Sequence, residues 1–484
     1  MEAKHSVNKV TAGALLITLG IIYGDIGTSP LYVMKAIFGN SPINSNLVLG
    51  AVSCVLWTLT LQTSIKYVWL TLQADNKGEG GIFSLYTLVK KLKKKWLIVP
   101  ALIGGSAMLA DGFITPPISI SSAIEGIKIY YPDLKTIPIV IGIILVLFFF
   151  QSYGTKTIGK FFGPIMLVWF LMLGGVGLLQ ITQVPEILKA VNPYYAYLLL
   201  TEHPEGFYVL GFVFLCTTGA EALYSDLGHC GIKNIRISWM FVKTTLALNY
   251  LGQGAFLLSH TNIQLKTFDN GVEFIQNPFY LMMPEWFIPI GIVIATLAAV
   301  IAAQALITGS FTMINEAMRL NLWPRVLVKY PSIIKGQLYI PSTNWILCIG
   351  CILVVLYFKE SSNMEAAYGL AIIMCMIATS ILLTYYMILK RFNKLIILAF
   401  VLVYSILEIS FFIANIDKFH HGGYVSLIVA GAIAFVMTIW FLGKRIRKNY
   451  TEFVRLEDYT TVIEDLSNDE SIPQYANNLI YLTN

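Results

Sequence analysis

Acidic and hydroxyl-bearing residues interrupt the first long apolar segment of the chain, residues 12–38. The interruption reads Gly24-Asp-Ile-Gly-Thr-Ser-Pro30, and Tyr32 follows two residues later. Carboxylate, hydroxyl and carbonyl oxygens are the ligands that hard cations prefer. Unwound backbone survives inside a membrane only where it faces protein or a polar cavity, and its freed carbonyls can then bind a substrate. The segment therefore predicts an unwound, cation-binding break in a membrane span, with Asp25 as the leading candidate because an ionisable residue at this depth is functional by default.

Two further apolar segments carry oxygen ligands. Asp111, Thr115 and Ser119 are four residues apart, which aligns them on one face of a helix. The prolines at 116 and 117 free backbone carbonyls near them. Tyr368 lies among small residues, where helices approach closely. Both segments are candidates for additional cation ligands.

The sixth apolar segment is interrupted like the first. Residues 217–226 contain two threonines, a glycine and the carboxylates Glu221 and Asp226. Broken helices at matching positions of two halves point to a binding site at the middle of the membrane. If each half has five helices, the second half enters the membrane from the opposite side, because five is odd. The pattern predicts an inverted five-plus-five repeat with discontinuous helices one and six, although the residues of the two halves do not repeat.

The composition is that of a polytopic membrane protein. Of the 484 residues, 56% are hydrophobic and only 12% are charged, against about 25% charged residues in soluble domains. Since a span needs about 20 apolar residues, twelve spans are expected in an all-α transmembrane domain covering residues 1–442. They are residues 12–38, 47–72, 97–127, 136–152, 161–182, 206–229, 238–260, 286–315, 343–358, 366–389, 395–415 and 421–442.

Basic residues crowd every second loop and both ends of the chain. By the positive-inside rule, this alternation places both termini in the cytoplasm, and the net charge of +6 reflects topology and not nucleic-acid binding. We expect a bacterial plasma membrane, since no targeting extension is evident. Residues 443–484 are predicted to begin a cytoplasmic region that stops early, at a strand-like segment formed by residues 478–484.

A glycine cluster surrounds Glu79 near the cytoplasmic end of the second span. It lacks the Gly-Lys-Ser/Thr ending of a phosphate loop, so it predicts a tight turn or a gate, and Asp226 is a second gate candidate. The sequence contains no nucleophile elbow, phosphate loop or metal motif. These features predict a transporter that is not an enzyme and needs no cofactor.

Five segments of the chain resemble signature stretches of the KUP/HAK/KT potassium-uptake permeases, and they occur in the same order. They are residues 24–32 (GDIGTSPLY), 74–81 (ADNKGEGG), 111–119 (DGFITPPIS), 219–229 (GAEALYSDLGH) and 367–371 (AYGLA). The resemblance implies the amino acid-polyamine-organocation superfamily fold, a LeuT-like five-plus-five inverted repeat. It also implies potassium uptake driven by proton symport.

The resemblance also assigns roles to residues of this chain. The implied K⁺ ligands are Asp25, Tyr32, Thr115, Ser119, Thr217 or Thr218, and Tyr368. Asp111 and Glu221 match acidic positions tied to transport, and we hypothesise that one of them carries the coupled proton. Relatives usually continue into a cytoplasmic C-terminal domain, which is where homodimer contacts are expected.

Our interpretation of the sequence is a secondary transporter that accumulates K⁺ with H⁺ by alternating access. A cationic amine or amino-acid permease of the same fold is the first alternative, although Asp25 argues against a site for a substrate carboxylate. A passive K⁺ channel is the second alternative. It is disfavoured because the chain lacks a TVGYG-type filter and a four-fold repeat.

Overall fold

The computed structural model describes residues 10–39, 42–153, 159–204, 206–261, 265–269, 272–330, 338–420, 422–450 and 455–468. This part of the chain is helical apart from one antiparallel hairpin. In the hairpin, β1 (Lys266–Asp269) pairs with β2 (Val272–Ile275), and Lys266 lies opposite Ile275. The predicted all-α class is therefore correct apart from eight residues, four in each strand. The strand-like segment predicted at residues 478–484 lies outside the described residues.

Each predicted span coincides with helical structure, in several cases with more than one element. In chain order these elements are α2 (Ala12–Ile22) with α3 (Gly24–Thr28), η1 (Ser29–Leu31) and α4 (Val33–Phe38); α5 (Ser45–Thr58) with the π-helical η2 (Leu59–Leu70); α7 (Ile98–Ile124); α8 (Ile137–Phe150); α9 (Gly159–Gln183); α11 (Gly206–Val213) with η9 (Phe214–Thr217), α12 (Ala220–Ser225) and α13 (Leu227–Cys230); α14 (Ile232–Ser259); α16 (Ile288–Arg319); α17 (Pro341–Phe358); α18 (Ser361–Leu389); α19 (Lys394–Ile416); and α20 (Gly423–Asn449). The elements between or after them include α6 (Gly81–Val89), η6 (Glu125–Ile129), η8 (Pro185–Val191), α10 (Tyr194–Glu202), α15 (Pro278–Leu281), η10 (Asp417–Phe419) and α21 (Thr460–Asn468).

Nine helices of the described chain are long and apolar enough to cross a membrane, and the bent pair Ala12–Ile22 and Gly24–Phe38 makes a tenth. The chain is thus a helical polytopic membrane protein. Two predicted spans do not meet this criterion. Helix α8 has only 14 residues, and α14 carries polar residues such as Lys243, Asn249 and Gln253 along its length. The total of twelve spans therefore remains a prediction.

Several helix boundaries follow from local residues. Thr11 Oγ1 accepts a hydrogen bond from the amide of Ala14 at 3.1 Å and caps α2. Asn44 caps α5 in the same way through the amide of Leu47 at 2.7 Å. Pro341 begins α17 at a position where a missing amide hydrogen costs nothing.

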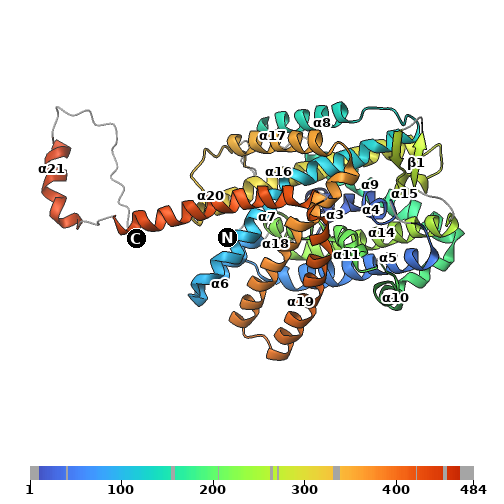
Figure 1. Cartoon of the computed structure of the whole chain (residues 1–484). Helices are drawn as coiled ribbons and strands as arrows, with labels where there is room; N and C mark the ends of the chain where they lie inside the picture. The colour runs from blue at the N-terminus through green and yellow to red at the C-terminus, as the bar shows by residue number, and fades with distance from the viewer. Residues whose placement is uncertain are drawn as a thin grey trace.

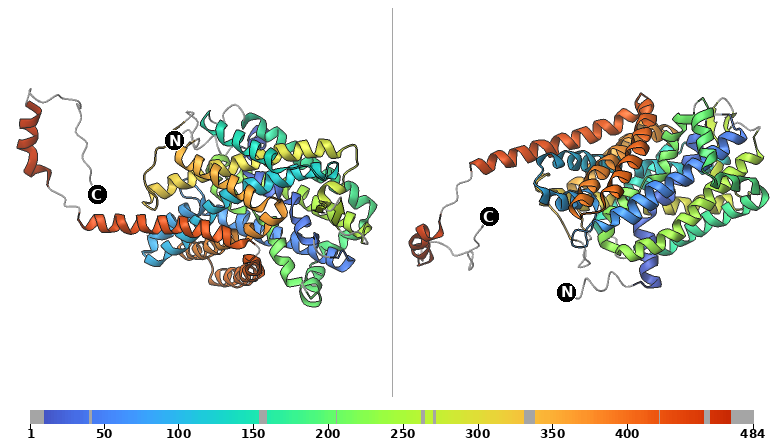
Figure 2. Two further views of the ribbon diagram at one scale, coloured as in Figure 1. Left: turned by 45° about the horizontal axis from the view of Figure 1, so that its top comes forward. Right: turned by 90° about the horizontal axis from the view of Figure 1, so that it is seen from below.

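Helix α7 lies at the centre of the bundle and packs against α16, α17, α18 and α20. Helix α14 packs against α9 and α5, and α19 packs against α18. The two further views in Figure 2 show α20 projecting beyond the other helices. Helices α19 and α20 leave large apolar side chains such as Leu395, Ile406 and Ile428 exposed, which suits contact with lipid.

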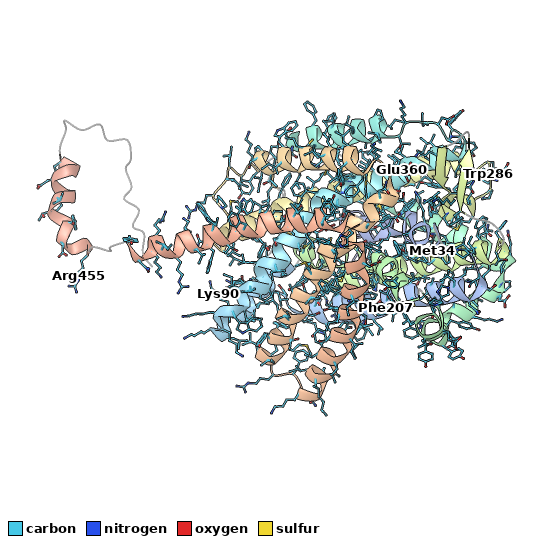
Figure 3. The ribbon with its side chains drawn as sticks, viewed as in Figure 1. Met34, Lys90, Phe207, Trp286, Glu360 and Arg455 are labelled. Atoms are coloured by element: carbon cyan, nitrogen blue, oxygen red, sulfur yellow. The ribbon has the colours of Figure 1, made fainter. Side chains whose placement is uncertain are left out.

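The bundle has two distinct ends. Figure 3 shows Lys90, at the end of α6, at one end, and Trp286 and Glu360 toward the other. Figure 1 shows the β1 hairpin, α10 and α15 at the Trp286 end and the last turns of α20 at the Lys90 end. The lysine-rich connection that begins at Lys90 and the exposed Trp286 thus lie toward opposite ends of the bundle.

Candidate cation site

The first broken span bends by 71° between α2 and the helical segment Gly24–Phe38. The bend lies at Tyr23, whose φ of −99° and ψ of 16° leave the helical range. Residues after it form α3 and η1, so the prediction that 24–30 are unwound was wrong. The hydroxyl of Thr28 donates to the carbonyl of Asp25 at 2.9 Å, and Pro30 occupies the first turn of η1, where proline is tolerated. Both features favour short helical turns.

Side chains from α9, α14 and the N-cap of α15 hydrogen-bond three carbonyls of this span. The bonds are Trp169 Nε1 to Gly27 O at 2.9 Å, Gln253 Nε2 to Pro30 O at 3.0 Å, and Asn277 Nδ2 to Leu31 O at 2.6 Å. Buried carbonyls are costly to leave without a partner. These donors therefore stabilise the broken segment, and the side-chain oxygens are better placed than these carbonyls to bind an ion.

The sixth span breaks at Thr218 and Gly219. Thr218 adopts an extended conformation, with φ of −57° and ψ of 143°, and Gly219 has a φ of +86°. A Cβ atom at Gly219 would lie 2.6 Å from the amide nitrogen of Ile26 and 3.0 Å from Cβ of Asp25. Only glycine fits this conformation and this contact. The two breaks therefore meet directly, as the paired interruptions in the sequence suggest.

Three hydroxyls gather where the broken spans meet, and we call them the hydroxyl cluster. Ser29 Oγ lies 3.3 Å from the Tyr32 hydroxyl and 3.2 Å from Thr218 Oγ1, and the Tyr32 hydroxyl lies 3.1 Å from Thr218 Oγ1. Nearby, Ser119 Oγ of α7 lies 3.4 Å from Thr28 Oγ1. All five side chains are fully buried. The cluster thus concentrates polar oxygens in an otherwise apolar interior.

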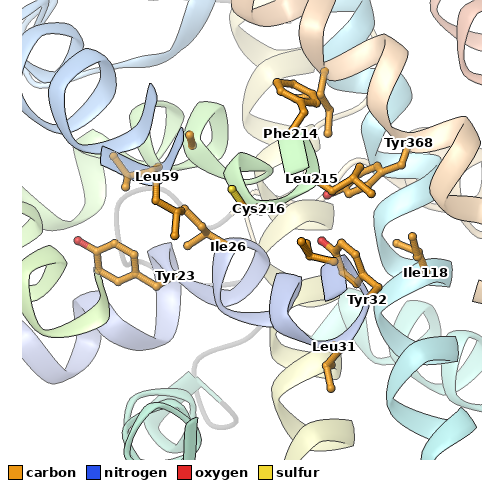
Figure 4. Close-up of a cluster of buried hydrophobic side chains, with 14 of the residues drawn as sticks. Tyr23, Ile26, Leu31, Tyr32, Leu59, Ile118, Phe214, Leu215, Cys216 and Tyr368 are labelled. Atoms are coloured by element: carbon orange, nitrogen blue, oxygen red, sulfur yellow. The ribbon is translucent and has the colours of Figure 1, made fainter. Parts of the chain in front are cut away.

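The carboxylate of Asp25 lies next to the hydroxyl cluster. The Tyr368 hydroxyl donates to Asp25 Oδ1 at 3.1 Å. The ring of Tyr368 packs edge to face against the ring of Tyr32, with the ring centroids 6.1 Å apart. Figure 4 shows the two tyrosines together. Asp25 is 2% exposed, and its Oδ2 atom has no hydrogen-bond partner in the described structure. A buried carboxylate oxygen with a free lone pair is a strong candidate for binding a cation.

Asp111 and Glu221 line a small cavity beside this site, together with Gly219 and Cys375. Asp111 Oδ1 accepts the hydroxyl of Thr115 at 2.5 Å, which confirms that residues 111 and 115 share a helix face. Gly219 links this cavity to Asp25, because a Cβ atom at Gly219 would lie 3.0 Å from Cβ of Asp25. Three acidic side chains therefore follow one another from the junction of the broken spans to the cavity.

Neutral hydroxyl groups hold Glu221. Tyr67 of η2 donates to Oε1, and Thr379 of α18 donates to Oε2 at 3.2 Å. Glu221 belongs to α12, the second half of the sixth span, and is 6% exposed. Its carboxylate is therefore anchored by two neighbouring spans and is in contact with the cavity.

The structure separates the remaining candidates from the hydroxyl cluster. Thr217 donates to the carbonyl of Phe214 at 2.8 Å, a bond within its own helix. Glu79 is half-buried in a tight turn with Asn76, as predicted: each amide donates to the carbonyl of the other residue, at 3.0 and 3.1 Å. Asp226 is 8% exposed between α12 and α13. Of the two threonines, therefore, Thr218 is the one that joins the cluster.

Sequence reasoning missed two buried ion pairs. Lys66 of η2 lies 2.6 Å from Glu408 of α19, and Lys35 of α4 lies 2.9 Å from Glu125 of η6. Ser361 bridges the two residues of the second pair, because its hydroxyl donates to Glu125 at 2.5 Å and accepts from Lys35 at 3.2 Å. All four charged residues lie inside predicted spans. Their presence in apolar segments was a signal that each needs an opposite charge.

Fold and site together define a polytopic helical membrane protein with a buried oxygen-lined site at the junction of two broken spans. Residues 12–445 match the family described as K⁺ potassium transporter integral membrane domain. The chain belongs to this family of potassium transporters, which confirms the resemblance seen in the sequence and the prediction that the protein is a transporter and not an enzyme.

Similar proteins agree with this assignment. The chain is 64% identical to the probable potassium transport system protein Kup of Flavobacterium psychrophilum, over 99% of this chain and 72% of the relative. It is 49% identical to the probable potassium transport system protein Kup 1 of Lactobacillus acidophilus, over 98% and 75%. A solved structure of the Eremococcus coleocola manganese transporter is similar at 13% identity and a TM-score of 0.45, covering 91% of this chain and 94% of that one. This last likeness is too remote to inform function.

Proposed function

We propose that this protein carries K⁺ into the cell by alternating access. The observation that carries the proposal is the unpaired oxygen of Asp25 beside the hydroxyl cluster, at the place where two broken spans meet. The K⁺ ligands are Asp25, Tyr32, Thr218 and Tyr368, with Thr115 and Ser119 from α7, while Thr217 acts mainly by shaping the break. The charge of Asp25 offsets the loss of water around the ion.

The size of the site favours an atomic ion. The three hydroxyls lie within 3.1 to 3.3 Å of one another, so K⁺ can enter after small shifts. An ammonium group alone is close to K⁺ in size, but the organic chain attached to it would force the broken spans apart, because the side chains around the cluster are fully buried. This geometry argues against the cationic amine or amino-acid permease that the sequence left open. Full burial of the cluster also argues against an open channel.

We propose a LeuT-like inverted five-plus-five architecture, with α19 and α20 as additions. The breaks in spans one and six support it, because they have matching positions in the two halves and pack against each other through Gly219 and Ile26. In this arrangement, movement of the broken helices opens the site to one side at a time.

We also propose that transport is coupled to protons, with Glu221 or Asp111 as the carrier. Both acids line the cavity, and neither is the carboxylate that pairs with K⁺. A membrane potential contributes about 2.3 kcal/mol per charge per 100 mV, and a co-transported proton doubles this drive. The coupling therefore permits accumulation against a steeper gradient.

Different side chains close the two ends of the path to the cation site. The Lys35–Glu125–Ser361 network closes the side on which Glu360 and Trp286 lie, and Glu79 and Asp226 contribute to the opposite gate. With both termini in the cytoplasm of a bacterial cell, the first side faces outward.

Uptake into proteoliposomes with an internal pH dye tests the proposal. Wild-type protein should admit K⁺ with simultaneous acidification, and Asp25→Asn should abolish both. Asp133→Asn is a matched control, because it makes the same change at an exposed residue between η6 and α8. Glu221→Gln should abolish acidification if Glu221 is the carrier, and continued acidification would assign that role to Asp111.

The same assay distinguishes the alternatives. K⁺ entry without acidification in the wild-type protein would indicate a uniporter or channel. Inhibition of K⁺ entry by low concentrations of organic amines, together with uptake of the amine itself, would indicate a permease.

A further inference from the structure

The ion pair between Lys66 and Glu408 lies beside Glu221 and takes no part in the hydroxyl cluster. The two side chains are 0% and 3% exposed. Lys66 Nζ also donates to the carbonyl of Met376 at 2.9 Å, and Ser380 donates to Glu408 at 2.7 Å. An apolar pair of similar volume usually stabilises a protein as well or better. Stability alone therefore does not explain the pair.

The backbone around Lys66 is specialised. Residues Leu59–Leu70 are π-helical, a rare conformation that concentrates at functional sites. Lys66 and Tyr67 are adjacent in sequence, yet both are fully buried. Helix α19 makes two hydrogen-bonded contacts with this segment. Glu408 accepts from Lys66, and the Tyr404 hydroxyl donates to the carbonyl of Leu61 at 2.8 Å. The wide helical turn thus presents an ammonium to Glu408 and a phenol to Glu221.

Several titratable groups face Glu221 from the elements packed around it. In the described part of the structure they are Lys66 and Tyr67 of η2, Asp111 of α7, Tyr224 of α12, Cys375 of α18 and Glu408 of α19. Lys66 is the cation of this group. Its ammonium is in direct contact with Glu408, whereas the hydrogen bonds to Glu221 come from the neutral hydroxyls of Tyr67 and Thr379.

Among Lys66, Glu408 and Glu221, charge balance leaves Glu221 as the group that takes up a proton. One ammonium compensates one carboxylate, and an additional buried carboxylate without a counterion is strongly disfavoured. Because Glu408 is bonded to Lys66 at 2.6 Å, a proton on Glu221 makes the trio of Lys66, Glu408 and Glu221 neutral. If Glu408 lost its charge, Glu221 would become the counterion of Lys66 within this trio and would stay ionised.

We propose that Glu408 is a positioning residue for the proton step: by neutralising Lys66, it leaves Glu221 free to bind and release the coupled proton. The inference rests on the proposed symport. It gives α19, which lies outside the ten-helix repeat, a part in energy coupling.

The test is the external-pH profile of initial K⁺ uptake into proteoliposomes. Glu408→Gln should move the midpoint of this pH profile toward acid pH by about one pH unit or more, since the positive charge of Lys66 then favours the ionised form of Glu221. Lys66→Met combined with Glu408→Gln removes both charges and should return the midpoint to the wild-type value. Glu408→Asp keeps the charge but shortens the side chain, so it should shift the midpoint less, in the same direction.

Glu125→Gln is the matched control, because it breaks a second buried ion pair, which is formed by other elements, α4 and η6. It should reduce the amount of folded protein or the rate of uptake without moving the midpoint. A role for Glu408 in stability alone predicts the same behaviour for Glu408→Gln. An unchanged midpoint in Glu408→Gln would therefore overturn the inference. If Glu408→Gln does not fold, Glu408→Asp takes its place. An unchanged midpoint of the pH profile in Glu408→Asp would then overturn the inference.

Measurements on the wild-type protein distinguish a failure of the proposed symport from a failure of the proposed role of Glu408. If wild type acidifies the vesicles and the Glu408 variants keep its midpoint, symport stands and the role of Glu408 is refuted. If wild type admits K⁺ without acidification, symport itself fails and the inference fails with it.

Discussion

The two adjacent threonines of the sixth span provide a matched pair of substitutions. Both are fully buried, and each donates one hydrogen bond to a carbonyl three residues earlier, at 2.8 Å for Thr217 and 2.9 Å for Thr218. Only Thr218 also contacts Ser29 and Tyr32. Replacing either residue with valine preserves shape and removes one hydroxyl. We expect Thr218→Val to weaken K⁺ binding and Thr217→Val to leave it nearly unchanged.

The size of the effect follows from the contacts that are lost. A hydrogen bond to a charged group contributes about 1.5 to 3 kcal/mol, and we take the same range for a hydroxyl dipole against K⁺. Without Thr218 Oγ1, Ser29 and Tyr32 can still bond each other at 3.3 Å, so both remaining hydroxyls of the cluster keep a partner. We therefore take the low end of this energy range. Since about 1.4 kcal/mol is a factor of ten, the KM for K⁺ should rise about tenfold.

The measurement is the K⁺ dependence of initial uptake in proteoliposomes, with thermal unfolding in detergent as a check on stability. Both variants lose the hydrogen bond to the carbonyl three residues earlier, and Ser29 and Tyr32 still bond each other in Thr218→Val, so the Tm values of the two variants should fall by similar small amounts. An equal rise in KM for the two variants, or none for Thr218→Val, would refute the assignment of Thr218 to the ion site.

Three further predictions concern the packing of the two broken spans. Gly219→Ala should abolish uptake, since its Cβ would press on the segment that carries Asp25; normal transport activity would contradict this account. Lys35→Met should lower stability by about 3 to 5 kcal/mol by leaving Glu125 buried without its counterion, measured as the shift of Tm, and an unchanged Tm would argue against the pair. Trp169→Phe removes the indole donor to a carbonyl of the first broken span and should cost about 1 to 3 kcal/mol, with a rise in the KM for K⁺ and a lower Tm as the observable results.

Much of the site could be predicted from residue types alone. Asp25 and Glu221 are ionisable groups inside strongly apolar segments, and such groups seldom occur there without a role. The spacing of Asp111 and Thr115 fixed their common helix face before any fold was known. The burial of these carboxylates and the shared helix face could be predicted because each depended only on a single element or on the contrast between a residue and its surroundings; the roles of Asp25 and Glu221 in transport stay predictions.

Other features depended on contacts between distant segments. Nothing local distinguishes Thr217 from Thr218; the extended turn at Thr218 decides which hydroxyl faces Ser29. The expectation of an unwound first span was wrong because Thr28 and Pro30 support short helical turns, and because donors from other helices bind the freed carbonyls.

The sequence by itself determined that the chain spans a membrane, that its first and sixth spans are interrupted, and that a carboxylate lies in the first interruption. Hydrophobicity and residue type set these properties locally. Only the tertiary structure decided which oxygens meet at Asp25 and which charges compensate one another, because Lys66 and Glu408 are 342 positions apart. Pairings of this kind are selected by the packing of whole helices, where an unpaired buried charge is too costly to remain.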